Sequence, residues 1–308
     1  MAPSRGDGRG MDRRTFLARL PAGAAAAGLG RGRRELLPTI PLGKYRITRL
    51  VAGCNPISGY SYLGHHMDQH MKDYFTVERT VEFLRQCEEA GINAFQFSLS
   101  SEKIPEVLRR MHEAGSSMHF IGLHAGREKV REVAEGLRPI AMVHHGGVTD
   151  RLFAEGKSGE VRDYVKEVHD RGLLAGVSAH NPDCLRRIAD EGWEVDFFMA
   201  CFYHITRKGP PEGAGPAPAV LPVGGYQFYA DDPLAMTRVI REVPHPCLGF
   251  KILAAGRKCS SPQTVRAAFR FAFENIKPTD GVIVGMYPRF SDEVGANARY
   301  TREFAKPG

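Results

Sequence analysis

Three histidines, His124, His144 and His180, each lie at the end of a short apolar run of the kind that forms buried strands. If these runs are neighbouring parallel strands, their ends meet at one face and the imidazoles converge. Imidazole titrates near neutral pH, and its neutral nitrogen binds zinc or iron. A metal held by His124, His144 and His180, with His145 as an alternative to His144, would polarise a carbonyl or activate water. Without a metal, the histidines would act directly as acid and base on a polyol or keto-sugar.

Lys251 is a charged residue inside an apolar segment, residues 249–252. Its ammonium group would stabilise an enolate-like oxyanion, form a Schiff base if its pKa were lowered, or pair with a loop carboxylate. Few carboxylates follow the apolar runs, which argues against all-oxygen magnesium sites and paired-carboxylate glycosidases. The alternative is that each histidine only binds loop backbone. The expected catalytic residues are His144, His124, Lys251 and Gln96, and the expected substrate-binding residues are Asn55, Tyr60, His145, Asn181 and Tyr203.

Eight short apolar runs alternate with eight helical segments from residue 40 onward. A helical stripe is clear in residues 158–171, where Val161, Tyr164, Val165 and Val168 recur at helical spacing. The expected strands are 47–54, 92–98, 118–124, 139–145, 173–179, 195–203, 246–253 and 281–287. The expected helices are 76–90, 101–114, 127–136, 158–171, 182–191, 232–242, 261–276 and 291–304.

This strict alternation predicts an α/β fold, a (β/α)8 barrel, which typically needs about 250 residues. A doubly wound open sheet is the rival, but no expected strand is followed by GxGxxG. Long connections follow the first strand (to about residue 75) and the sixth (residues 204–230). Both connections belong to the face of the barrel that carries the active site in barrel enzymes, so we expect them to form a lid. For the second connection, the alternative is a flexible insertion without a function.

The first 38 residues are expected to be an export signal and linker, with the barrel domain at 39–308. Arg13 and Arg14, followed by Phe16 and Leu17, resemble a twin-arginine (Tat) signal. The alternative is a disordered basic N-terminus. The apolar stretch after the arginines is too short to span a bilayer. An exported protein is therefore predicted, with the Tat machinery as partner and no integral membrane segment; a leader that stayed uncleaved would serve as an anchor.

The formal charge of +7 belongs mainly to this leader, because residues 1–34 contain eight Arg and two Asp. A nucleic-acid partner is therefore not expected. The six cysteines include no CxxC pair, so neither a disulfide framework nor a zinc knuckle is indicated. The expected partner of the barrel is a small-molecule substrate.

Several segments, taken in order, resemble the aldo/keto reductase superfamily. They are residues 41–53, 91–95, 176–178, 281–285 and 291–293, with Asn297. The resemblance implies an N-terminal β-hairpin before the barrel. It also implies an NADP site in which Gly285, Arg289 and Asn297 contact the phosphate and adenine.

The catalytic Asp, Tyr, Lys and His of that family fall on Gln96, Ser101, His124 and His144 of this sequence. Only His144 keeps its residue type. Because Tyr donates the proton in carbonyl reduction and Lys lowers its pKa, this chain lacks the usual reductase mechanism. The sequence thus resembles a divergent member of that superfamily, and the resemblance supports the fold and does not carry over the reaction.

Three functions remain open. The first is an exported barrel enzyme that acts on a small polar carbonyl or sugar-derived substrate through its histidines, with zinc or iron if a metal is present. The second is an NADP-linked oxidoreductase with a tightly bound cofactor and His144 as donor. The third is a non-catalytic barrel that binds sugar.

Overall fold

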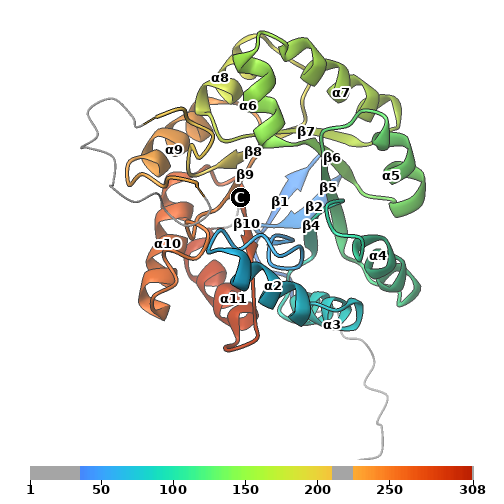
Figure 1. The fold of residues 1–308 in the computed structure, drawn as a ribbon, viewed down its shortest axis with the longest axis vertical. Coiled ribbons are helices and arrows are strands. Elements are labelled where there is room, and N and C mark those ends of the chain that lie inside the picture. Colours follow the sequence, from blue (N-terminus) through green and yellow to red (C-terminus); the bar gives the residue numbers. More distant parts are fainter. Residues whose placement is uncertain (1–34, 210–224, 307–308) are drawn as a thin grey trace, which may run out of the picture. The chain divides into compact units, whose positions relative to one another are not determined.

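The computed structural model describes residues 35–209 and 225–306. Eight parallel strands close into a barrel in the order β10-β3-β4-β5-β6-β7-β8-β9, surrounded by helices (Figure 1). This closure confirms the predicted (β/α)8 barrel and excludes an open doubly wound sheet. The barrel strands are β3 Leu50–Gly53, β4 Ala94–Ser98, β5 His119–His124, β6 Ala141–His144, β7 Leu174–Ala179, β8 Phe197–Cys201, β9 Cys247–Phe250 and β10 Gly281–Gly285.

Each expected helix is present, with ends shifted by a few residues. Thr76 caps α3 by accepting from the Arg79 N–H, and Ser261 forms a capping box with Thr264 at the start of α10. Apolar stripes such as Val161, Tyr164, Val165 and Val168 in α7 are buried. These helices are α3 Val77–Glu89, α4 Ile104–Glu113, α5 Lys129–Leu137, α7 Ser158–Asp170, α8 Pro182–Asp190, α9 Asp232–Glu242, α10 Pro262–Asn275 and α11 Glu293–Phe304.

Two further helices were not expected from the sequence. α2 His65–Tyr74 lies in the long connection after β3 and contains no buried residue, so it lacks a clear apolar stripe. α6 Gly146–Ala154 follows β6 directly and begins with two glycines, which are poor helix formers. Tertiary packing of α6 against β7 and α7 overrides this propensity. α6 proves important for the candidate active site.

An antiparallel hairpin precedes the barrel, formed by β1 Thr39–Leu42 and β2 Tyr45–Thr48. This confirms the expected N-terminal hairpin, and it divides the expected strand 47–54 between β2 and β3. The hairpin side chains Ile40, Leu42 and Ile47 are fully buried in one cluster with interior residues at the amino-terminal ends of the barrel strands. The hairpin therefore closes that end of the barrel.

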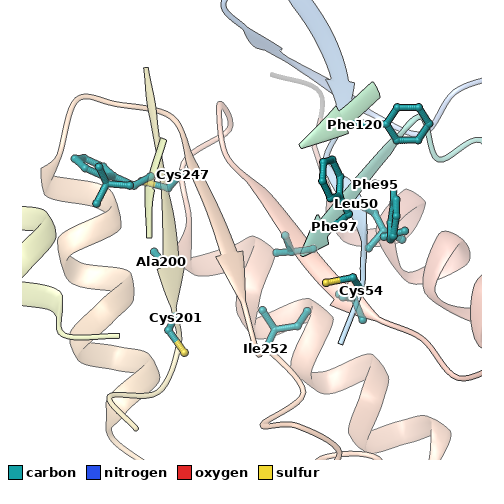
Figure 2. Close-up of a cluster of buried hydrophobic side chains, with 14 of the residues drawn as sticks. Leu50, Cys54, Phe95, Phe97, Phe120, Ala200, Cys201, Cys247 and Ile252 are labelled. Carbon is teal, nitrogen blue, oxygen red and sulfur yellow. The ribbon is translucent and has the colours of Figure 1, made fainter. Parts of the chain in front are cut away.

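Side chains alternate between the barrel interior and the layer beneath the helices. Val143 belongs to the interior cluster, whereas its neighbour Met142 packs in the outer cluster. Figure 2 shows part of the outer cluster, with Phe95, Phe97 and Phe120 from β4 and β5. This two-residue period decides which residues at the strand ends reach the mouth of the barrel.

The proposed export signal falls on residues outside those described, apart from residues 35–38. Leu37 is buried and its N–H donates to the Gly91 carbonyl, so packing on the barrel begins before residue 39. Within residues 35–209 and 225–306, no helix combines the length and apolar character needed to cross a bilayer.

Candidate active site

Asp150 of α6 fixes the position of His180, the residue that follows β7. Its carboxylate accepts from His180 Nδ1 at 2.9 Å and from the backbone N–H groups of His180 and Asn181 at 3.1–3.2 Å. The Thr206 hydroxyl, from the connection after β8, donates to the same carboxylate at 2.8 Å. Both partners are largely buried, so the imidazole is held in one orientation.

The electrostatics of this pair favour a neutral imidazole beside an ionised carboxylate. Burial raises the pKa of Asp150, but hydrogen bonds from His180 and Thr206 outweigh it and leave the pKa below its usual value. Burial lowers the pKa of His180 more than Asp150 raises it. His180 therefore carries its proton on Nδ1, toward Asp150. Its Nε2 has no hydrogen-bond partner among the described residues and is available as a base.

Lys251 lies on the same side of the barrel, directly after β9. Its Nζ is 4.8 Å from the ring centroid of Phe250, and the ring of His180 is 5.7 Å from the same ring. Lys251 has a left-handed backbone, with φ of 59°. Because non-glycine residues seldom adopt this conformation, the surrounding structure must enforce it.

The ammonium form of Lys251 is favoured. Burial lowers its pKa, but Cys201, Tyr62 and Tyr226 outweigh this and raise it above the usual value. A Schiff-base role needs the opposite shift, so that alternative is not supported. Within the described part of the chain no carboxylate pairs with Lys251, contrary to the expected loop ion pair.

Aromatic residues from the two long connections meet above Lys251. The ring of Tyr62, after β3, lies 4.7 Å from Lys251 Nζ and 5.3 Å from the ring of Tyr226. Tyr226 and Phe228 belong to the connection after β8, and Phe228 packs on Tyr203 at 5.1 Å. We call Tyr62, Tyr203, Tyr226 and Phe228 the aromatic cover. The two connections predicted to form a lid are therefore in contact with each other.

His145 is the fourth titratable group at the mouth. It is exposed and stands at the start of α6. Burial of part of its ring and the charges of His180 and Lys251 lower its pKa, which indicates that the three groups are near one another. We call His145, Asp150, His180 and Lys251 the mouth cluster.

His144 does not join the mouth cluster. Its ring lies 5.0 Å from Tyr164 of α7, its Nδ1 is 2.7 Å from the Thr149 hydroxyl, and only 2% of the residue is exposed. The reason is the two-residue period of β6. Val143 points into the barrel, so His144 points outward, whereas His180 follows the outward-facing Ala179.

Among the described residues, His124 likewise forms no hydrogen bond or ring contact with His180. His124 pairs in register with His144 across β5 and β6, and its Nδ1 accepts from the Gly126 N–H at 2.9 Å. In residues 35–209 and 225–306, no three His, Cys, Asp or Glu side chains come together as a metal-binding set. The expected site of His124, His144 and His180 is therefore not assembled, and His144 is not placed to act on a substrate at the mouth.

No family model and no curated protein matches the chain. Among solved structures, it is similar to a truncated 3-deoxy-D-arabino-heptulosonate 7-phosphate synthase from Thermotoga maritima, with a TM-score of 0.52 and 14% identity over 87% of this chain and 91% of that one. It is also similar to the glycerol dehydrogenase from Gluconobacter oxydans, an aldo/keto reductase, with a TM-score of 0.50 and 12% identity over 88% and 96% of the two chains. The likeness is one of fold.

The residues expected to bind NADP do not form a phosphate site. Asp292 caps α11 by accepting from the Gly295 N–H, and Glu293 accepts from the Tyr287 N–H. These two carboxylates place negative charge at the helix start, where the cofactor phosphate would otherwise be favoured. Of the three expected residues, Gly285 lies against Pro56, Arg289 stacks on Tyr74 and Phe290, and Asn297 is buried.

α2 also covers the segment after β10. The Tyr287 hydroxyl lies 2.8 Å from His70 Nδ1, and its ring contacts Tyr74 at 5.1 Å. The expected cofactor position is thus packed by the protein itself. We conclude that these residues do not fit NADP.

The remaining predicted site residues differ in how far they are buried and in what they contact. Gln96 is buried and donates to the Phe97 carbonyl at 2.8 Å. Asn181 caps α8 through its side chain. Tyr60 is 51% exposed, and its N–H donates to the Asn55 carbonyl. Of the expected substrate-binding residues, Tyr203 and His145 therefore lie in the aromatic cover and the mouth cluster.

Asp150 and Thr206 belong to the site although no local pattern in the sequence singles them out. Asp150 lies in a helix that begins with two glycines, and it meets His180 across 30 positions. One signal in the sequence could have found Asp150. A buried histidine at the barrel mouth needs a hydrogen-bond partner, and Asp150 is the acidic residue in the segment 146–152, which directly follows a strand end.

Proposed function

We propose that this protein is a barrel enzyme that removes a proton from a carbon next to the carbonyl of a small polar substrate. In this proposal His180 is the base and Lys251 stabilises the oxyanion. The observation that carries it is the Asp150–His180 pair near the Lys251 ammonium group, which lies beneath the aromatic cover and forms no ion pair with a described carboxylate. The shared fold, found in many enzymes, agrees with this proposal.

The reaction follows from the proton positions. Nε2 of His180 accepts the proton, the C–H electron pair forms the double bond of an enolate, and the carbonyl oxygen takes up negative charge. Lys251 stabilises that charge, and Asp150 stabilises the imidazolium that forms. Return of the proton to the other face of the same carbon gives an epimer. In an α-hydroxy carbonyl compound, return of the proton to the neighbouring carbon, with transfer of the hydroxyl proton to the original carbonyl oxygen, gives an isomer. A general base of this kind contributes roughly 10²- to 10⁴-fold to the rate.

Exchange with solvent deuterium tests the proposal even when the product of the reaction is unidentified. A panel of small aldoses, ketoses and hydroxycarbonyls is incubated with the protein in D2O, and loss of each carbon-bound proton signal is followed by NMR. We expect exchange with at least one class of compound, reduced about 10²-fold or more in His180→Asn and in Lys251→Met.

A matched control is His169→Asn. His169 pairs with Asp196 at 2.8 Å, as His180 does with Asp150, but on α7 and away from the mouth cluster. We expect this variant to exchange protons at the wild-type rate. Exchange that survives His180→Asn unchanged would refute the assignment of the base.

Export through the Tat machinery is part of the same proposal. It rests on Arg13 and Arg14 in residues 1–38, which lie largely outside the described part of the chain. Replacing both with lysine is expected to retain the protein in the cytoplasm, as measured by cell fractionation. Equal export of both forms would contradict this assignment.

A sugar-binding barrel without catalysis is a second candidate, favoured by the aromatic cover. Tyr62, Tyr226 and Phe228 present ring faces and edges at the mouth, where sugar rings could stack. In that case saturable sugar binding would persist in His180→Asn, and no compound in the panel would exchange protons.

A further inference from the structure

The helix α2, in the long connection after β3, carries three histidines that the proposed reaction does not use: His65, His66 and His70. Imidazole nitrogen is a good ligand for zinc, copper and nickel ions. Two of them, His66 and His70, are four positions apart, so both lie on one face of the helix with Cβ atoms about 5–6 Å apart. Paired histidines at this spacing on a helix bind zinc in some metalloproteases.

The helix is held against the turn that precedes it. The carboxylate of Asp68 accepts a hydrogen bond from the Ser61 N–H at 2.9 Å. A Cβ atom added to Gly59 would lie 2.6 Å from the Lys72 side chain, which shows how closely the turn and the helix approach. Asp68 and Lys72 therefore belong to the face of α2 that contacts this turn, whereas the two histidines lie on a different face. A helix anchored in this way positions ligands more precisely than a free loop does.

Tyr287, after β10, fixes the ring of His70. Its hydroxyl lies 2.8 Å from Nδ1 of His70 and donates to the His70 carbonyl at 3.3 Å. A hydroxyl has one proton and a carbonyl only accepts, so both contacts are satisfied when Nδ1 carries a proton and donates it to the Tyr287 oxygen. Nε2 of His70 is then unprotonated, and it has no hydrogen-bond partner among the described residues. Metal-binding histidines are commonly held through their other nitrogen in this manner.

The surroundings leave both histidines accessible to a metal ion. The ring of His70 stacks on Phe290 at 5.9 Å, with an angle of 8° between the ring planes, and Phe290 is 74% exposed. His66 is exposed, and within the described part of the chain its ring contacts only that of His65, at 6.0 Å, and forms no hydrogen bond. Rotation of the His66 side chain toward His70 therefore breaks no contact other than this one.

We propose that His66 and His70 together bind a divalent transition-metal ion of the zinc, nickel or copper kind. Nε2 of His70 and one ring nitrogen of His66 are the two protein ligands. Residues 35–209 and 225–306 contain no set of three His, Cys, Asp or Glu side chains that could hold a metal, so water completes the coordination. The metal site is independent of the proposed reaction, because it uses no residue of the mouth cluster.

Calorimetric titration with Ni²⁺ and Zn²⁺ tests this site. Because Cys259 has an exposed thiol, which would also bind these ions, every protein in the series carries Cys259→Ser. We expect both ions to bind to this parent protein and Mg²⁺ to bind at least about tenfold more weakly, since Mg²⁺ prefers oxygen ligands. Thermal melts without metal confirm that each protein is folded.

Three variants and a matched control locate the ligands. His66→Ala and His70→Ala are each expected to weaken binding of Ni²⁺ and Zn²⁺ about tenfold or more, because two linked ligands bind far more tightly than one. Tyr287→Phe keeps the ring but removes the hydroxyl that holds His70, and is expected to weaken binding about tenfold. Tyr300→Phe removes a hydroxyl that donates to the Pro262 carbonyl instead, and is expected to leave binding unchanged. Equal losses in the two tyrosine variants would contradict the role of Tyr287.

His65→Ala decides between the proposed pair and its neighbour. If His66 and His70 are the ligands, His65→Ala keeps the affinity within about twofold of the parent protein, since adjacent helical positions do not face each other. Losses in His65→Ala and His66→Ala but not in His70→Ala would show that the adjacent histidines bind the metal and would overturn the proposal, as would equal affinity in all variants. Proton exchange should be equal in metal-free His66→Ala and in the parent protein, so failure of the reaction leaves the metal site intact.

Discussion

Asp150 determines which nitrogen of His180 can accept a proton. Its carboxylate only accepts hydrogen bonds, so the Nδ1 that faces it must carry the proton. An asparagine of the same shape offers an N–H group instead and allows the opposite tautomer, with the proton on Nε2. The base would then be blocked without any change in backbone.

We therefore expect Asp150→Asn to slow proton exchange about 10²- to 10⁴-fold, close to the effect of removing the base itself. The measurement is the NMR exchange rate, with a thermal melt to confirm folding, because Asp150 also accepts from Thr206 and the backbone. A folded Asp150→Asn protein with the wild-type rate would show that the tautomer of His180 is irrelevant.

The pH dependence of exchange follows from His180 and Lys251. The base works when neutral, and the pKa of His180 lies below its usual value, so the rate should rise with pH and level off before neutrality. The pKa of Lys251 is raised, so its ammonium group is lost only in strongly alkaline solution. Rates measured from about pH 4 to 10 should thus show an acidic limb and a broad plateau. A rate that falls between about pH 5 and 7 would contradict these roles.

At the scale of the element, β6 and α6 place two adjacent histidines in opposite surroundings. Burial between β6 and α7 lowers the pKa of His144 to about 4, with smaller effects from the charges of His145 and His124. The unfolded chain binds a proton near pH 6.5, so it gains protons before the folded protein does. The contribution of neutral His144 to the free energy of unfolding is therefore fully present above about pH 6.5, and it is lost as the pH falls toward 4.

For the wild-type protein this amounts to about 3 kcal/mol of unfolding free energy between pH 6.5 and 4. His144→Asn removes the titrating group, so its stability should fall less steeply over the same window. Urea unfolding of both proteins at about pH 7, 5.5 and 4.5 measures this. Parallel losses in the two proteins would mean that His144 does not contribute to acid sensitivity.

At the scale of the whole molecule, the hairpin and the mouth lie at opposite ends of the barrel. The side chains of Leu42 and Ile40 are fully buried at the closed end, whereas Tyr62 and Lys251 meet at the open one. Stability and chemistry are therefore largely separate in space, as is usual for this fold.

Leu42→Ala tests that separation. Removing a fully buried leucine side chain is expected to cost about 2–5 kcal/mol of unfolding free energy. We expect the folded variant to retain the wild-type exchange rate at room temperature, because Leu42 contacts nothing at the mouth. Chemical denaturation and the NMR exchange assay measure the two effects. A loss of activity in proportion to stability would show that the two ends are coupled.

The sequence alone was sufficient for the barrel because its signals are local. Apolar runs of strand length, the stripe of Val161, Val165 and Val168, and caps such as Ser261 depend on neighbours a few positions apart. The position of Lys251 and His180 near the mouth followed from the same pattern. α6 was missed because Gly146 and Gly147 conceal a helix that only tertiary packing stabilises.

Tertiary structure alone decided which side chains meet. The two-residue period of each strand turns His144 outward and His180 inward, and a shift of one residue in the strand end reverses the result. Asp150 reaches His180 across 30 positions and Thr206 across 56, so no local spacing records either contact. The strands and helices are thus properties of short segments, whereas the candidate active site is a property of the closed barrel.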